Sequence, residues 1–127
     1  MTAQDVVEFW LAGANDALKT AEELMIAERY HHALFFCHLA VEKMLKSVYV
    51  TKIGNVPPPL HNLLLLTDKA KIKLPEATLE QLREINTFNV EARYDDYKLK
   101  FYKKATKDFS EKWFSVTKKL LLWLKSI

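Results

Sequence analysis

Apolar residues recur at helical spacing throughout residues 30–49, and we expect this segment to form the central helix of the protein. Its apolar positions are Ala33, Leu34, Phe35, Phe36, Cys37, Leu39, Ala40, Val41, Met44, Leu45 and Val48. The polar residues that interrupt them are His38, Glu42, Lys43 and Lys46. A helix that is apolar on most of its circumference is usually buried among other helices.

The charged residues of this helix need partners, because an unpaired buried charge is very costly. Glu42 and Lys46 are spaced to pair on one face of the helix, and His38 lies four residues before Glu42. One interpretation is a core helix whose long side chains reach outward to water. The other is that these groups form a buried polar junction or line a groove.

A long helix is predicted before the central one. It begins near Asp5, where Thr2 and Asp5 have the spacing of a capping box, and its apolar pattern fades at Glu28 and Arg29. Its inward positions are Val7, Trp10, Ala14, Ala17, Ala21 and Leu24. Because only a few residues join it to the central helix, the two helices should be antiparallel neighbours.

Three helices are predicted after the central one. Gly54 and the prolines at 57–59 favour an extended connector, a short helix follows within residues 61–71, and a long helix starts at Pro75. The final helix has apolar residues at heptad spacing. The expected buried residues are Leu63, Leu66, Ala70, Leu79, Leu82, Ile85, Val90, Phe109, Trp113, Val116, Leu120, Trp123 and Ile127. With no convincing strand pattern, the prediction is an all-α antiparallel up-and-down bundle of four long helices plus one short helix.

The composition is that of a single folded domain over residues 1–127. Half of the residues are hydrophobic, and two glycines and four prolines are too few for a disordered chain. The single cysteine, Cys37, fits a reducing compartment. We read no signal peptide and no apolar run of the roughly 20 residues that a membrane span needs. A soluble, cytoplasmic protein is therefore expected.

The charge is distributed unevenly along the chain. Residues 1–92 contain nine Lys and Arg against twelve Asp and Glu, whereas residues 93–127 contain ten against four. The C-terminal third therefore carries a charge of +6, which indicates either an anionic partner or a solvated lysine-rich helix face.

A stretch from Arg93 to Lys107 interleaves cations with aromatic rings, a mixture suited to phosphate contact and base stacking. Its candidate ligand-binding residues, joined by two lysines of the central helix, are Arg93, Tyr94, Tyr97, Lys98, Lys100, Lys43 and Lys46. Asp95 and Asp96 oppose this interpretation, since they can pair with Arg93 and hold the loop together. They join His38 and Glu42 as candidates for a polar junction.

Most enzyme classes have no motif in this sequence. No His and Cys residues have zinc-ligand spacing, no glycine-rich phosphate loop is present, and no serine lies in a nucleophile motif. Glu28 and His31 spell the Glu-x-x-His of di-iron bundles, but such sites need a second copy. His31 and His32 are expected in solvent at a helix start, and His61 is expected to cap a helix or anchor a loop. No metal or cofactor is expected.

Several of these segments together resemble the HEPN domain family, whose name refers to nucleotide binding in higher eukaryotes and prokaryotes. The matching segments are Trp10 with Ala14 and Ala21, Tyr30 and Ala33, AVEKMLKSV at 40–48, His61 to Leu63 after the prolines, LPE at 74–76, and VEARYDDY at 90–97. The resemblance implies a homodimer whose facing bundles form a basic cleft. In many members this cleft acts on RNA or binds nucleotides, often beside a small nucleotidyltransferase.

The resemblance also implies a test for ribonuclease activity, because active members carry Arg-x4–6-His. Arg93 stands at the arginine position, but Lys98, Leu99 and Lys100 occupy the positions where the histidine could fall. Lysine is a poor acid–base substitute at neutral pH, with an unperturbed pKa of about 10.4 against about 6.5 for histidine. The catalytic motif is therefore degenerate.

The leading hypothesis is a dimeric nucleotide- or RNA-binding module that acts with a nucleotidyltransferase in a toxin–antitoxin-like pair. Two alternatives stay open. One is an active ribonuclease that uses Arg93 with Tyr97 or Lys98 in place of the histidine. The other is a purely structural oligomeric adaptor.

Overall fold

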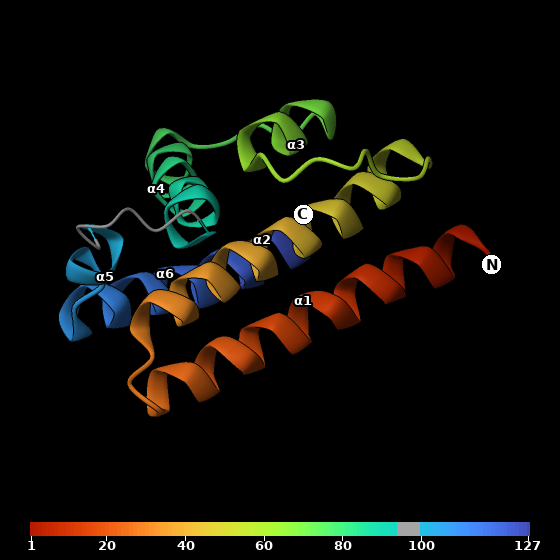
Figure 1. Ribbon diagram of the computed structural model, residues 1–127. Helices are drawn as coiled ribbons and strands as arrows, with labels where there is room; N and C mark the ends of the chain where they lie inside the picture. The colour runs from red at the N-terminus through yellow and green to blue at the C-terminus, as the bar shows by residue number, and fades with distance from the viewer. Residues whose placement is uncertain (94–99) are drawn as a thin grey trace.

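The structure is a computed structural model that describes residues 1–93 and 100–127, with the side chains of residues 90–93 left aside (Figure 1). Every regular element in these two ranges is a helix. The helices are α1 (Ala3–Ile26), α2 (Tyr30–Ile53), α3 (Leu63–Lys69), α4 (Glu76–Arg93), α5 (Lys100–Lys104) and α6 (Lys107–Ser126). The predicted all-α bundle is confirmed, and the five-residue helix α5 is an element that the sequence pattern did not reveal.

Helix α2 is the centre of the bundle, as predicted, because it contacts each of the other five helices. In Figure 1, α1 and α6 lie lengthwise beside α2, while α3 and α4 cover another side of it and α4 runs across its direction. The buried apolar side chains of α2, including Leu34, Val41 and Leu45, form the middle of the core. No helix in the described part of the chain is long and apolar enough to cross a membrane.

Capping residues explain where α1 begins, and small residues explain how it packs against α2. Thr2 and Asp5 form the predicted capping box, and α1 begins at Ala3, two residues before the expected start. Ala14, Ala17 and Ala21 are buried against α2. Their short side chains let the two helix backbones approach closely along their length.

The polar residues of α2 lie inside the fold. His38, Glu42 and Lys46 are all buried, so the interpretation of long side chains reaching outward to water is wrong for Lys46. Its ammonium group lies 3.1 Å from the carboxylate of Glu42, which supplies the opposite charge that a buried lysine needs. The buried polar junction is therefore the correct alternative for these three residues.

The buried face of α6 is rotated from the predicted heptad seam. Trp113 and Leu120 are buried as expected, but the remaining predicted positions are half-buried or exposed. The other buried residues of this helix are Ser110, Thr117, Leu121 and Leu124. Thr117 is tolerated there because its hydroxyl donates to the carbonyl oxygen of Trp113 at 2.8 Å. A straight helix also drifts away from a strict heptad repeat by about 20° per heptad.

An aromatic cluster fixes the short helix α5 against the bundle. Phe88 of α4, which the pattern did not single out, lies 5.9 Å from Phe101 of α5 and 6.1 Å from both Phe109 and Trp113 of α6, between ring centroids. Lys104 adds an ion pair to Glu84 of α4 at 3.4 Å. With Phe101 buried in the cluster, the polar residues of α5 are directed toward the surface.

Candidate functional site

The first group of candidate residues forms a buried polar junction between α2 and the connector that precedes α3. One carboxylate oxygen of Glu42 accepts a hydrogen bond from Lys46 at 3.1 Å, and the other accepts one from Nδ1 of His61, also at 3.1 Å. His38 donates from Nε2 to the backbone carbonyl of His61 at 3.0 Å. Because a carboxylate prefers charge-assisted donors, this arrangement satisfies Glu42 inside the fold.

The junction also reaches α1 and holds the connector in place. The Lys46 ammonium lies 5.1 Å from the centre of the Trp10 ring, a cation–π distance. The predicted loop-anchoring role of His61 is confirmed, whereas the cap of α3 is Asn62, which accepts from the backbone of Leu64 and Leu65. With Glu42 and Lys46 almost fully buried, this junction stabilises the fold and offers little surface to a ligand.

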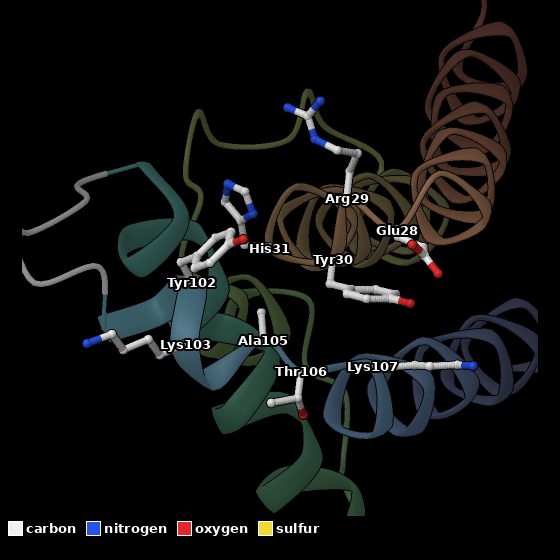
Figure 2. Close-up of a pocket in the computed structure, with 9 residues that line it drawn as sticks. All are labelled: Glu28, Arg29, Tyr30, His31, Tyr102, Lys103, Ala105, Thr106 and Lys107. Atoms are coloured by element: carbon white, nitrogen blue, oxygen red, sulfur yellow. The ribbon is translucent and has the colours of Figure 1, made fainter.

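A second group of residues lines an open pocket of about 370 Å³ where two interhelical turns meet. We call it the turn pocket, and it is shown in Figure 2. Residues of the α1–α2 turn and of α5 and the α5–α6 turn line it, namely Glu28, Arg29, Tyr30, His31, Tyr102, Lys103, Ala105, Thr106 and Lys107. The sequence segments that supply these two sides are some 70 residues apart, and only the fold brings them together.

The side chains of the turn pocket combine positive charge with aromatic rings. Arg29, Lys103 and Lys107 are cationic, and Glu28 is the acidic residue among those that line it. Figure 2 shows Tyr30 extending from the first turn of α2 toward the start of α6, and His31 beside Tyr102. The guanidinium group of Arg29 points away from α5 and α6 in this view.

The N-terminal ends of two long helices lie at the turn pocket. Arg29 occupies the N-cap position of α2 and does not cap it with its side chain, while Thr106 caps α6 and accepts from the backbone of Phe109. Helix N-terminal ends carry a partial positive charge and favour nearby anions. The C-terminal ends of α1 and α5 lie at the same turns and carry a partial negative charge, so the positive character of this region comes from the three cationic side chains.

The histidines at the start of α2 differ from the expectation that both are in solvent. His32 is exposed, but His31 is half-buried. The centroid of the His31 ring lies 5.2 Å from that of the Tyr102 ring and 3.9 Å from that of the His32 ring. His31 thus places an imidazole in the turn pocket. Within the residues that the structure describes, no cluster of His, Cys, Asp and Glu could hold a metal ion.

The remaining predicted site residues have different positions. Arg93 is the last residue of α4, and Lys100 is the exposed first residue of α5. Lys43 is half-buried and packs over Gly13 of α1, where a Cβ would lie only 3.0 Å from the Lys43 Cδ. Lys46, expected to bind a ligand, is occupied by its buried ion pair. Tyr94, Asp95, Asp96, Tyr97 and Lys98 lie outside the described residues.

The basic-aromatic stretch from Arg93 to Lys107 contains the α5 side of the turn pocket, whereas nothing in the sequence places the α1–α2 turn beside it. The segment from Glu28 to His31 is predicted only as a helix boundary with an incomplete metal motif, although it too interleaves charged residues with an aromatic ring. This mixture of charged and aromatic residues is the sequence feature that could have indicated a binding segment. Because Tyr102 and Lys107 are far along the chain, the sequence does not show that the two segments lie side by side.

A sequence model of the HEPN domain matches residues 7–127. The chain belongs to the HEPN domain family. HEPN domains are known to dimerise. No curated protein matches this chain.

Two solved structures share the HEPN fold seen here. The crystal structure of TT1696 from Thermus thermophilus has a TM-score of 0.82 at 22% identity, and the match covers 94% of this chain and 96% of that one. ST0689, described as an archaeal HEPN homologue, has a TM-score of 0.73 at 22% identity, with 94% and 95% covered. At this identity the likeness concerns the fold.

Proposed function

We propose that this HEPN domain binds RNA or a nucleotide in the turn pocket and acts as a homodimer. The observation that carries the proposal is that Arg29, Lys103 and Lys107 line one open pocket at the start of two long helices. Phosphate groups are bound by cationic side chains and by backbone N–H groups at helix starts. The pocket therefore has the chemistry of a phosphate-containing ligand.

The tyrosines of the pocket favour a ligand that also carries a base. Tyr30 and Tyr102 come from opposite sides of the pocket, and Tyr102 is 58% exposed, so its ring is accessible for stacking. Aromatic side chains stack on unpaired bases in proteins that bind single-stranded nucleic acids. The volume of about 370 Å³ lies in the range of small-ligand pockets, which begins at about 300 Å³.

The proposed role is binding without cleavage. Arg93 ends α4, but lysine and leucine occupy the positions where the ribonuclease motif of the family has its histidine. The rival function is a ribonuclease that uses Arg93 with Tyr97 or Lys98. His31 is a further candidate for a ribonuclease, because its imidazole lines the turn pocket, although the side chain of Arg93 lies outside the described part of the structure.

Binding to a fluorescently labelled eight-nucleotide single-stranded RNA tests the proposal. Lys103→Ala and Lys107→Ala should each weaken binding several-fold and lower the salt dependence by about one phosphate's share. Lys119→Ala is the matched control, since this exposed lysine of α6 lies about 18 Å along the helix from Lys107. Equal affinity in all four proteins would show that the turn pocket is not the binding site.

The same RNA, incubated with the protein and separated on a gel, tests for cleavage, and we expect it to stay intact. Robust cleavage that Arg93→Ala abolishes would favour the ribonuclease, and His31→Ala would then be compared with Tyr97→Phe. Light scattering at tens of micromolar should show a dimer, whose population depends on concentration. Co-purification with a small nucleotidyltransferase encoded next to this chain would support the hypothesis that the two proteins act as a toxin–antitoxin-like pair.

A further inference from the structure

Glu28 is the residue of the turn pocket that phosphate binding does not explain. Glu28 lines a pocket whose other charged residues are cationic, and its carboxylate repels a phosphate placed beside it. None of the ion pairs formed among the described residues involves Glu28. The negative charge therefore has no partner within this part of the chain that would account for its place in the pocket.

The backbone at Glu28 is fixed in a conformation that favours glycine. Its φ angle is +60°, in the left-handed region. The N–H of Glu28 donates to the carbonyl of Met25 at 3.0 Å, and that of Arg29 donates to the carbonyl of Leu24 at 2.8 Å. These are the two hydrogen bonds of a Schellman motif, in which glycine is the usual residue at this position. A side chain here lowers the stability of the turn relative to glycine.

One other residue of the described chain shows that this backbone strain alone does not mark a site. Lys71 ends α3 in the same way, with φ of +58° and hydrogen bonds from Lys71 to Asp68 and from Ile72 to Thr67. Lys71 does not line the turn pocket. The inference about Glu28 therefore depends on its carboxylate and its place, and Lys71 serves as a control for the strain.

We infer that Glu28 determines the specificity of the turn pocket by accepting hydrogen bonds from donor groups of a bound nucleotide. This inference rests on the proposed function. In RNA, guanine presents two adjacent N–H donors on its Watson–Crick edge, which can engage both oxygens of a carboxylate, whereas the other bases present single donors there. The ribose 2′-hydroxyl is a further donor. The cationic side chains hold the phosphates, and Glu28 reads a donor-bearing part of the same ligand. A bare polyanion lacks such donors and gains nothing from the carboxylate.

The experiment compares four eight-nucleotide single strands: RNA of alternating G and U, oligo-A RNA, and the all-deoxy counterpart of each. They are titrated into the unmutated protein and its Glu28→Gln, Glu28→Gly and Glu23→Gln variants. Glu23→Gln removes one exposed negative charge of α1 that does not line the pocket, so it controls for general electrostatics. Lys71→Gly controls for relief of strain.

If Glu28 reads guanine, the unmutated protein binds the G-containing strands about tenfold more tightly than the A strands, and Glu28→Gln and Glu28→Gly remove this gap. If it reads the ribose, RNA binds more tightly than DNA for both sequences, and the same two variants remove that gap. Glu23→Gln and Lys71→Gly leave either gap unchanged. Glu28→Gly and Lys71→Gly should both raise the melting temperature by a few degrees, which shows that the variants are folded.

The inference is overturned if neither gap exists in the unmutated protein, or if Glu28→Gln and Glu28→Gly leave it unchanged or tighten binding of all four strands equally. In these outcomes the strands still bind, and Lys103→Ala still weakens them, so the proposed function stands. Failure of the proposed function has a different signature: the unmutated protein binds none of the strands.

Discussion

Removing the charge of Glu42 should destabilise the protein strongly, because Lys46 would keep a buried positive charge without its partner. The Glu42→Gln variant retains the shape of the side chain. The side chains of Glu42 and Lys46 are only 5% and 7% exposed, and their charged atoms are 3.1 Å apart. Breaking a buried pair by removing one partner typically costs about 3–5 kcal/mol.

The expected loss lies at the lower end of that range. The Trp10 ring stays 5.1 Å from the Lys46 ammonium, and such a contact retains about 1 kcal/mol of favourable interaction. We therefore expect Glu42→Gln to lower the free energy of unfolding by about 3 kcal/mol. His61→Ala should cost about 1 kcal/mol, because the His61 side chain is 55% exposed and Glu42 keeps its bond to Lys46.

Urea unfolding followed by circular dichroism, at one fixed protein concentration, measures these values. A double-mutant cycle with Lys46→Met then isolates the interaction between the two charges. Because the double variant leaves neither charge buried, its loss should be smaller than the sum of the single losses by about 2 kcal/mol. The reasoning is refuted if Glu42→Gln costs less than about 1 kcal/mol, or if the losses of Glu42→Gln and Lys46→Met simply add.

Four further predictions concern the core, the buried thiol, the end of α4 and the end of α3. Leu45→Ala should cost about 2–5 kcal/mol in the same urea experiment, since Leu45 is fully buried on the central helix, and a loss below about 1 kcal/mol would contradict that position. Burial raises the pKa of Cys37 from 9.0 to about 12, so the thiol should not react with a disulfide reagent at pH 8 unless the protein is unfolded. Above pH 9 the thiol loses its proton in the unfolded protein and keeps it in the folded protein. The free energy of unfolding should therefore fall between pH 9 and pH 12, by at most about 4 kcal/mol. The Cys37→Ala variant should lack this part of the pH dependence. Arg93→Ala should lower the salt dependence of RNA binding by about one phosphate's share with an unchanged melting temperature; a lower melting temperature that Arg93→Lys does not restore would instead indicate a structural clasp. Lys71→Gly should raise the free energy of unfolding by about 0.5–1 kcal/mol, because glycine adopts the positive φ of this position without steric cost, and a loss of stability would contradict the strain.

The buried junction and the turn pocket can be tested separately. The buried junction around Glu42 concerns the stability of the bundle, so its variants should unfold more easily. Variants of the turn pocket, such as Lys103→Ala, change an exposed residue, and their effect should appear in binding while stability stays within about 0.5 kcal/mol. A variant that changes both properties would connect the two sites.

Local sequence patterns were enough to define the class of fold and its central helix. Helical periodicity is a local property, so the apolar pattern around Leu45 and the capping box of Thr2 and Asp5 can be predicted without any tertiary contact. The spacing of Glu42 and Lys46 on one helix likewise predicted their ion pair. The AVEK segment at residues 40–43 and the other matching segments resemble the HEPN family, to which the chain belongs.

Features that depend on which segments meet were set by tertiary packing. Thr117 is buried on α6 because the fold directs its face of the helix inward and its hydroxyl bonds within the helix, and an apolar pattern cannot show that. His61 reaches Glu42 only because the connector folds back over α2. The turn pocket joins Glu28 and Tyr30 to Lys107 across more than 70 residues of chain. Periodicity reports which face of one helix is apolar, whereas a binding site depends on which helix ends the packing brings together.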